Sequence, residues 1–486
     1  MLTILSSSQL RTLLLSLTRE EILSLQRNLA NALHEYSTGT QEAGCAASYQ
    51  PPRTAITRQD GRTTLFMPAS TGQTVGIKMI SLKDPAGGDN QAGCVVDTHL
   101  SVQGSSSRGS RSPRGHNPRD SMASVASDLS DLSISSQEDN NYNNSSNLLG
   151  SSVASSSGNW SSGETSEASS LPASGCVNRQ SVSSTLGAWP GAGTRDTSPR
   201  GSVTLLDAQS EPFGLISAQE LTAFRTALSA LMLFTPRRRV RTLTVFGAGR
   251  QAYWHIRLAL TLRRDEIKRV YILNRSFERA AALLRDIYSA ENSGWRGGVK
   301  FSAMSSDFVE YTRLRREAVR KADVIFCCTP AVEPLFPAEL LTAREGRQKG
   351  RLVSAVGSYK PHMAELHPDI LRDEADGASA SHRHYHKHTP RSGVVVVDSL
   401  EAALQEAGEI VQSGLQPQQL VELGELLMVK RATEGGSDEE KSLHDWVERG
   451  NVVYKSVGLG LMDLVTGGDL IRLARERNIG TTVEDF

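Results

Sequence analysis

The sequence predicts an α/β fold in which a doubly wound parallel sheet is accompanied by a second, α+β domain. In the middle of the chain, short and continuously apolar runs alternate with helical patterns, as a parallel sheet covered on both faces requires. A glycine-rich turn also joins the first of these runs to a helix. The expected strands are Leu243–Phe246, Val270–Leu273, Val324–Cys328, Leu352–Val356 and Val394–Val397.

Composition excludes several classes of function. The chain has 486 residues, with 53 basic and 53 acidic side chains and a formal net charge of zero. No global basic field therefore favours nucleic acid or an anionic membrane as a partner. The five cysteines are too scattered for a disulfide framework or a zinc site, and the apolar N-terminal stretch is too short and too interrupted to span a bilayer. We expect a cytoplasmic protein without a metal.

The N-terminal region predicts one helix and one strand. Thr18 and Glu21 form a capping box ahead of an amphipathic helix that runs to Gly39. Alternation over residues 74–81 predicts a strand in which Lys78 lies on the face opposite the main apolar row. This strand and helix belong to the second domain.

Two segments have the composition of insertions. Residues 101–200 contain 30 serines and almost no periodic apolar spacing, so we expect them to be largely disordered. Strand patterns lie on both sides, at residues 74–81 and 203–206, which favours an insertion within one domain. The histidine-rich segment Ser381–His388 lacks carboxylate or cysteine support for a metal and is interpreted as a loop.

A second helix carries a polar stripe. Ser217 and Glu220 predict another capping box, and the apolar positions that follow share one helical face. Arg225 lies in a stripe of threonine and serine on the other face. This helix therefore presents two distinct surfaces.

The glycine-rich turn predicts a dinucleotide site. Gly247 permits a tight turn, Gly249 lets a pyrophosphate approach the backbone, and Ala252 allows close packing of the helix on the strand. The helix N-terminus supplies free amides and a positive dipole to the phosphates. The cofactor-binding residues expected here are Gly247, Ala248, Gly249, Arg250, Gln251 and Ala252.

The end of the next strand favours NADP(H) over NAD(H). The sequence there is Asn274-Arg275-Ser276, with no carboxylate for a ribose hydroxyl until Glu278. A guanidinium flanked by two polar side chains can instead pair with a 2′-phosphate. Thr329-Pro330, which follows the strand at residues 324–328, is expected to line the nicotinamide pocket at the carboxyl edge of the sheet.

The segment Val245–His255 resembles the ornithine cyclodeaminase/mu-crystallin family, whose fingerprint is a G-x-G-x-Q-A turn. The resemblance covers nearly the whole chain outside the two insertions. Further matching stretches follow in the family's order: Thr64–Pro68 with Gly76–Lys78, Leu221–Ala227, Ala355–Ser358, and Tyr454–Gly458 with Asp463.

This resemblance implies a homodimer in which a Rossmann domain is inserted into a substrate-binding and dimerisation domain. The chain then divides into five parts. They are the first part of the substrate domain (1–100), the serine-rich insertion (101–200), the second part of the substrate domain (201–235), the NADP-binding Rossmann domain (236–414) and a C-terminal segment that returns to the substrate domain (415–486).

The resemblance also implies a site. In the family, two arginines and a lysine hold the substrate carboxylate near the nicotinamide, and the matching residues here are Arg53, Lys78 and Arg225. Lys78 and Arg225 are the expected catalytic residues, since a lysine beside a bound carboxylate can deliver a proton to an imine nitrogen. Further cofactor contacts are expected from Gly357, Ser456 and Gly458. His255 is expected to be a packed residue, outside the site.

One departure from the family pattern bears on the reaction. Members that cyclise ornithine carry an aspartate two residues after the glycine that matches Gly357, and this chain has Tyr359 there. The leading hypothesis is therefore an NADP(H)-dependent oxidoreductase that reduces a small cyclic ketimine acid. The alternatives are an ornithine cyclodeaminase, which forms proline and ammonia, and a catalytically inactive protein that binds NADP(H) and a ligand.

Overall fold

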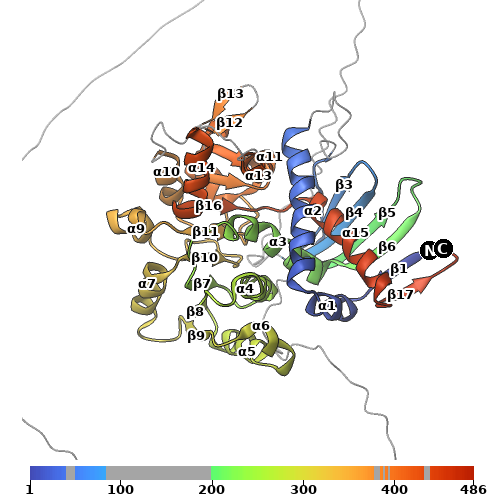
Figure 1. The fold of residues 1–486 in the computed structure, drawn as a ribbon, viewed down its shortest axis with the longest axis horizontal. Helices are drawn as coiled ribbons and strands as arrows, with labels where there is room; N and C mark the ends of the chain where they lie inside the picture. Colours follow the sequence, from blue (N-terminus) through green and yellow to red (C-terminus); the bar gives the residue numbers. More distant parts are fainter. Residues whose placement is uncertain (40–49, 84–198, 377–383, 387–388, 392–394, 432–437) are drawn as a thin grey trace, which may run out of the picture. The chain divides into compact units, whose positions relative to one another are not determined.

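The computed structural model describes residues 1–39, 50–83, 199–376, 384–386, 389–391, 395–431 and 438–486, and two sheets organise them (Figure 1). Sheet A has the strand order β17-β1-β6-β5-β4-β3-β2, and sheet B has the order β15-β14-β16-β11-β10-β7-β8-β9. The strands of sheet A are β1 (Leu2–Leu5), β2 (Thr54–Thr57), β3 (Arg62–Ser70), β4 (Val75–Lys83), β5 (Arg200–Leu206), β6 (Pro212–Ser217) and β17 (Thr481–Val483).

Sheet B is parallel throughout, which confirms the predicted fold class. Its strand order reverses between β7 and β10, and ligands of such sheets bind at this reversal, outside the carboxyl ends of the strands. The strands are β7 (Thr242–Phe246), β8 (Arg269–Asn274), β9 (Lys300–Ser305), β10 (Val324–Cys327), β11 (Leu352–Ala355), β14 (Val395–Val397), β15 (Leu420–Glu422) and β16 (Val452–Lys455).

Helices cover both sheets. Helix α15 packs on sheet A, across β3 to β6, and lies beside α2 (Figure 1). None of the described helices combines the length and the apolar character that a transmembrane span requires. The helices are α1 (Ser7–Leu15), α2 (Arg19–Thr38), α3 (Ala218–Phe234), α4 (Arg250–Arg263), α5 (Phe277–Ile287), η3 (Ala290–Asn292), α6 (Ser293–Arg296), α7 (Tyr311–Lys321), α8 (Glu339–Thr342), α9 (Arg344–Gln348), α10 (Pro368–Asp376), α11 (Leu400–Glu406), α12 (Gly408–Ser413), η4 (Pro417–Gln419), α13 (Leu423–Arg431), α14 (Asp438–Arg449) and α15 (Gly460–Glu476).

The two predicted capping boxes have different outcomes. At α2, Glu21 N donates to Thr18 Oγ1 (3.2 Å) and Thr18 N donates to Glu21 Oε2 (2.8 Å), so the first prediction is confirmed. At α3, Ser217 makes no side-chain cap, so the second prediction is wrong. The carboxylate of Glu220 instead accepts hydrogen bonds from Arg250 and Trp254 of α4, so both of its oxygens are used for tertiary contacts.

Strand β4 buries the face that carries its lysine. Val75, in the predicted apolar row, is 48% exposed, whereas Lys78 on the opposite face is 2% exposed. Gly76 and Ile80 share the buried face, which packs against α15. The predicted alternation is therefore present, but the lysine points inward.

The serine-rich segment lies outside the described residues, apart from its end at 199–200, so its predicted disorder stays a prediction. The strands on its two sides, β4 and β5, pair with each other antiparallel, with Ser81 opposite Arg200. The histidine-rich segment Ser381–His388 is described only at residues 384–386, in β12 (His384–His386), which pairs with β13 (Thr389–Arg391).

The C-terminal part of the chain contributes strands to both sheets. Strands β15 and β16 follow Gly414 and belong to sheet B, and only after Lys455 does the chain pass to α15 and β17 at sheet A. We expected the return to begin at residue 415. The division into five parts stays a prediction.

Candidate functional site

A cavity of about 200 Å³ lies at the carboxyl ends of β10 and β11, facing α3 and β4. Its volume suits a small ligand, since sites for drug-sized molecules span roughly 300–1,000 Å³. Tyr359 and most of the predicted site residues line it. The predicted residues found there are Arg53, Lys78, Arg225, Gly249, Arg250, Gln251, Thr329, Pro330, Gly357 and Ser456.

A buried ion cluster forms one wall of this cavity. Lys78 Nζ lies 3.0 and 2.9 Å from the two carboxylate oxygens of Asp463, and Arg225 Nε lies 3.2 Å from Asp463 Oδ2. The three side chains are at most 4% exposed. They come from β4, α3 and the first turn of α15, so the packing of α15 on sheet A assembles the cluster. Two cations share one carboxylate here, which favours binding of a further anion.

The ionisation of Lys78 is shifted by its surroundings. Burial lowers the pKa of the Lys78 ammonium to about 8, the Asp463 carboxylate opposes this shift, and the Arg225 guanidinium adds to it. An ordinary lysine stays charged far above neutral pH. Lys78 therefore holds its proton at pH 7 but releases it more readily, which suits a group that donates a proton.

Arg53 reaches the same cavity from the segment before β2. Its Nε donates to Glu406 Oε1 at 2.5 Å, and its terminal nitrogen also contacts that carboxylate. Glu406 ends α11, so Arg53 connects sheet A with the helices of sheet B. Arg53, Lys78 and Arg225 thus all line one cavity, although they have two different acidic partners.

The glycine turn fits a dinucleotide. Gly247 has a φ of 110°, and a Cβ there would lie 2.7 Å from the carbonyl oxygen of Cys328. A Cβ on Gly249 would meet nothing within 4 Å, so the space in front of this backbone is open to a phosphate. Ala248 and Ala252 are buried, and Ala252 lets α4 pack on the sheet. Residues 247–252 would therefore hold the pyrophosphate of a nicotinamide cofactor.

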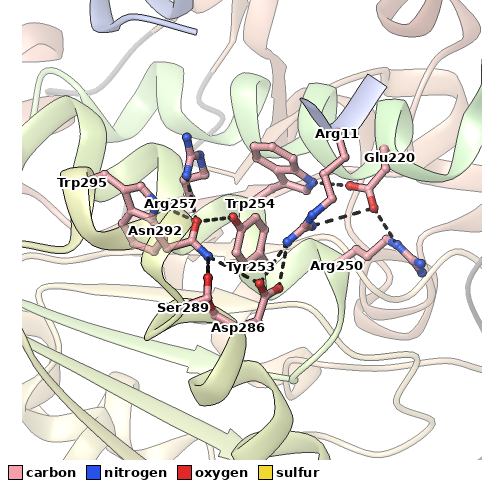
Figure 2. Close-up of polar contacts among 10 residues, drawn as sticks. All are labelled: Arg11, Glu220, Arg250, Tyr253, Trp254, Arg257, Asp286, Ser289, Asn292 and Trp295. Carbon is pink, nitrogen blue, oxygen red and sulfur yellow. Dashed lines mark hydrogen bonds and ion pairs between the residues drawn. The ribbon is translucent and has the colours of Figure 1, made fainter. Parts of the chain in front are cut away.

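Hydrogen bonds and ion pairs anchor α4, which begins at Arg250, to α3 and α1 (Figure 2). Arg250 Nε donates to Glu220 Oε1 (2.9 Å), and Trp254 Nε1 donates to Glu220 Oε2 (2.8 Å). Arg11 of α1 contacts Glu220 at 4.0 Å, and its Nη2 donates to both carboxylate oxygens of Asp286 (3.0 and 2.9 Å). Helix α3 therefore carries both Arg225 and the carboxylate that holds the first residue of α4.

One end of the cavity, where the nicotinamide ring is predicted to lie, is bounded by the loops after β10 and β11. Thr329 and Gly357 line it, and both donate to the buried carboxylate of Glu365. Burial raises the pKa of the Glu365 carboxyl to about 7, against the effect of the Lys455 ammonium. Pro330 follows Thr329 in the same wall.

Ser456 and Gly458 lie after β16 and share one acceptor. Ser456 Oγ and Gly458 N each donate to Asp398 Oδ2 at 2.7 Å. Ser456 lines the cavity, whereas Gly458 lies against the Arg225 side chain: its φ is 98°, and a Cβ there would lie 2.8 Å from an Arg225 guanidinium nitrogen. A side chain at residue 458 would therefore displace Arg225.

The residues predicted to select NADP(H) lie at the end of β8, away from the cavity lining. Asn274 Nδ2 donates to the carbonyl of Ser276 (2.8 Å), and the Ser276 hydroxyl caps α5 and donates to Glu278 (2.7 Å). Arg275 is exposed, and its carbonyl accepts from Ser305 Oγ. Of the three, Arg275 alone presents an exposed cation at this edge.

His255 lies on α4, and its side chain is buried. Its Nδ1 lies 2.7 Å from the carbonyl of Gln251, and burial lowers the pKa of its imidazole to about 4. A neutral, helix-bonded imidazole agrees with leaving it out of the site.

The carboxylates of the site were not predicted as functional. Asp463 lies in one of the stretches that match the family, and its only other signal is that it is an acidic residue in an otherwise apolar helix start. Glu406, Asp398 and Glu365 had no local signal, because each contacts partners far away in the sequence. The cations were predicted without the acids that hold them.

Comparisons with known proteins agree with this geometry. A family model described as the ornithine cyclodeaminase/mu-crystallin family matches residues 200–472, more than half of the chain. A Delta(1)-pyrroline-2-carboxylate reductase of Bacillus cereus is 32% identical over 292 residues, which cover 58% of this chain and 74% of that protein. The ketimine reductase mu-crystallin of Mus musculus is 27% identical over 252 residues, 52% of this chain and 61% of that protein.

Solved structures share the fold at low sequence identity. The Thermococcus litoralis Delta(1)-pyrroline-2-carboxylate reductase, in complex with NADH and L-proline, has a TM-score of 0.56 at 17% identity and covers 99% of this chain and 100% of its own. An archaeal alanine dehydrogenase dimer with bound NAD also has a TM-score of 0.56, at 15% identity, over 100% of this chain and 99% of its own. Together with the family model and the 32% identity, these findings show that the chain belongs to the ornithine cyclodeaminase/mu-crystallin family.

Proposed function

We propose that this protein is an NAD(P)H-dependent reductase that converts a small cyclic ketimine carboxylate into the corresponding cyclic amino acid. The observation that carries the proposal is one cavity in which the Lys78–Asp463–Arg225 cluster faces the dinucleotide turn and the nicotinamide-side loops. The reductases named above, which act on pyrroline-2-carboxylate and ketimines, support the substrate class.

The side chains divide the work of binding and proton transfer. Arg225 and Arg53 hold the substrate carboxylate through planar guanidinium groups. A bound nicotinamide cofactor supplies the hydride, which adds to the imine carbon. Lys78 gives its proton to the imine nitrogen, so the C=N double bond becomes a C–N single bond with a new C–H and N–H, and water then returns a proton to Lys78.

The residue at position 359 favours reduction over ornithine cyclisation. Tyr359 lines the cavity where family members that cyclise ornithine carry an aspartate. A phenol near neutral pH is no base for an incoming amine. The cyclodeaminase hypothesis therefore ranks second, and a protein that binds NADP(H) and a ligand without turnover ranks third.

Turnover assays separate these functions. The proposal predicts that the purified protein oxidises NADPH when it receives pyrroline-2-carboxylate or its six-membered homologue. Release of ammonia from ornithine, without net consumption of cofactor, would favour the cyclodeaminase. Stabilisation by NADPH in thermal melts without turnover of any imine or amino acid would favour the binding protein.

The pH dependence of the reaction tests the role of Lys78. Because its pKa lies near 8 and the protonated amine is the proton donor, kcat/KM should fall as the pH rises through about 8. The rate is to be measured between pH 6 and 10. The substrate imine also titrates, so Lys78→Arg is the control: its residual activity should lack the fall that belongs to Lys78. An identical fall in both proteins would contradict this role.

We propose NADPH as the preferred cofactor, on the basis of Arg275. Arg275→Ala should raise the Kd for NADPH about 10- to 100-fold, since a charge-assisted bond contributes roughly 1.5–3 kcal/mol, and leave the Kd for NADH unchanged. Fluorescence titration measures both constants. Arg269→Ala, at the opposite end of β8, serves as the control and should change neither. An equal rise in the Kd for NADPH and the Kd for NADH would contradict recognition of the 2′-phosphate by Arg275.

A homodimer in the cytoplasm completes the proposal. The face of sheet A opposite Lys78 supports a dimer, because Ile56 and Val75 on this face are 54% and 48% exposed and Phe66, Ile77 and Met79 between them are partly exposed. Exposed apolar side chains along one sheet face favour association with a second copy. Sedimentation of the purified chain measures its oligomeric state.

A further inference from the structure

A single buried carboxylate joins the two loops at the nicotinamide end of the cavity. Glu365 Oε1 accepts from Thr329 N (2.6 Å) and Thr329 Oγ1 (3.0 Å), and Glu365 Oε2 accepts from Gly357 N (2.6 Å). Thr329 follows β10 and Gly357 follows β11, and both line the cavity. Each oxygen of one carboxylate therefore holds a different loop.

A second buried layer holds Glu365 itself. Glu365 N donates to Glu409 Oε1 (2.7 Å), and Ser358 Oγ donates to Glu409 Oε2. Lys455 Nζ lies 3.3 Å from Glu409 Oε2 and donates to Ser358 Oγ at 2.5 Å. Glu365, Glu409 and Lys455 are at most 1% exposed, so water does not compete for these bonds. The backbone of Glu365 is thus held by this second layer, while its carboxylate is held by the two loops.

The two loops are also in direct contact. A Cβ on Gly357 would lie 2.0 Å from the carbonyl oxygen of Thr329. Strands β10 and β11 pair in register up to Cys327 and Ala355, and just beyond them Val356 N donates to the carbonyl of Cys327. Beyond this last bond between the strands, the backbone amides of Thr329 and Gly357 donate to the Glu365 carboxylate instead of to each other's strand. Loss of one carboxylate oxygen would leave a buried amide without an acceptor, which costs about 1–3 kcal/mol or a shift of the loop.

We infer that Glu365 is a positioning residue for hydride transfer: it sets the separation of Thr329 and Gly357, and thereby the placement of the nicotinamide ring against the substrate. The inference rests on the proposed reductase function. Both carboxylate oxygens accept hydrogen bonds from the protein, so Glu365 acts through the loops and not as a proton donor to the substrate. A displacement of about 1 Å at such a site can cost roughly 100-fold in rate.

Glu365→Gln tests this inference, because the amide NH₂ replaces one of the two acceptors. We expect the Kd for NADPH to change less than about threefold, since the phosphate turn is untouched, and kcat to fall roughly 10- to 100-fold. The primary isotope effect on kcat with NADPH deuterated at the transferred position should rise. Glu374→Gln is the matched control: Glu374 on α10 is another glutamate whose pKa is raised by burial, but the charged groups that act on it are Asp373, Arg347 and Arg351. It should behave like the wild type.

A readout without turnover keeps the inference separate from the proposed function. The fluorescence lifetime of bound NADPH reports the surroundings of the reduced ring, and it should change in Glu365→Gln but not in Glu374→Gln. Wild-type protein that binds NADPH but reduces no imine would overturn the reductase proposal, while the lifetimes would still decide the role of Glu365. Absence of NADPH and NADH binding to the wild type would overturn both.

The inference is overturned if Glu365→Gln leaves kcat, the isotope effect and the lifetime at wild-type values. Should this variant not fold, Thr329→Val takes its place, because it removes the hydroxyl donor to Glu365 and keeps both backbone amides. It should lower kcat about 3- to 10-fold with a rise in the isotope effect. A loss of thermal stability with unchanged kcat would show a merely structural role.

Discussion

Replacing Arg225 by alanine should lower kcat/KM for the imino acid at least 100-fold, mainly through a higher KM. Arg225 lies in the cavity, and its removal takes away a guanidinium that would bind the substrate carboxylate. Charge-assisted hydrogen bonds contribute roughly 1.5–3 kcal/mol each, and 1.4 kcal/mol corresponds to a factor of ten. Steady-state kinetics with NADPH and pyrroline-2-carboxylate measure the effect.

Folding should survive this change. Asp463 keeps its two bonds to Lys78 when Arg225 is lost, so no acid is left unpaired in the core. Arg472→Ala is the control, because Arg472 on α15 is 57% exposed and pairs with Asp469 and Glu476 of the same helix, away from the cavity lining. A normal KM in Arg225→Ala would mean that the carboxylate binds elsewhere.

The second large effect is expected for Asp463→Asn. This variant leaves Lys78 and Arg225 together in the core without a counter-ion, and breaking a buried pair costs about 3–5 kcal/mol. Urea unfolding measures the free energy of unfolding. Because Asp463 raises the pKa of Lys78, its loss should also move the fall of kcat/KM to a pH below 8.

Asp469→Asn provides the comparison for stability. Asp469 lies on the same helix, where it accepts from Asn28 Nδ2 and pairs with the exposed Arg472. Its replacement should cost about 1 kcal/mol or less, as for other pairs near the surface. Equal losses in the two variants would refute the special role of the buried cluster.

The sequence predicted five of the six inner strands of sheet B, because strands buried on both faces are continuously apolar. The sixth, β16, is equally buried but was not predicted, because its segment was assigned to the return to the substrate domain. The weaker strands were missed for physical reasons: β9 is an edge strand with alternating exposure, and β15 has only three residues. Helix α1 was also missed, although Ser6 and Gln9 form a capping box at its start. The serines there interrupt the apolar stretch, so its pattern does not predict a helix.

The sequence predicted the phosphate turn and the cations of the site, but not the carboxylates that pair with the cations. The phosphate turn is a local pattern, and the cations came from the family resemblance. Their partners depend on contacts across the fold: Lys78 and Asp463 are 385 residues apart in the chain, and Arg53 and Glu406 are 353 apart. No spacing rule connects such pairs, because the packing of α15 and α11 brings them together.

The pairing of Ser81 with Arg200 has a consequence for how this protein tolerates changes in length. The polypeptide leaves sheet A and re-enters it at directly facing positions of one antiparallel ladder. A hairpin turn of a few residues or a connection of more than a hundred closes the same geometry, at an entropic difference of only a few kcal/mol. The connection between β4 and β5 can therefore become longer or shorter in evolution or by design. The register of the β4–β5 pair, which positions Lys78, does not depend on its length.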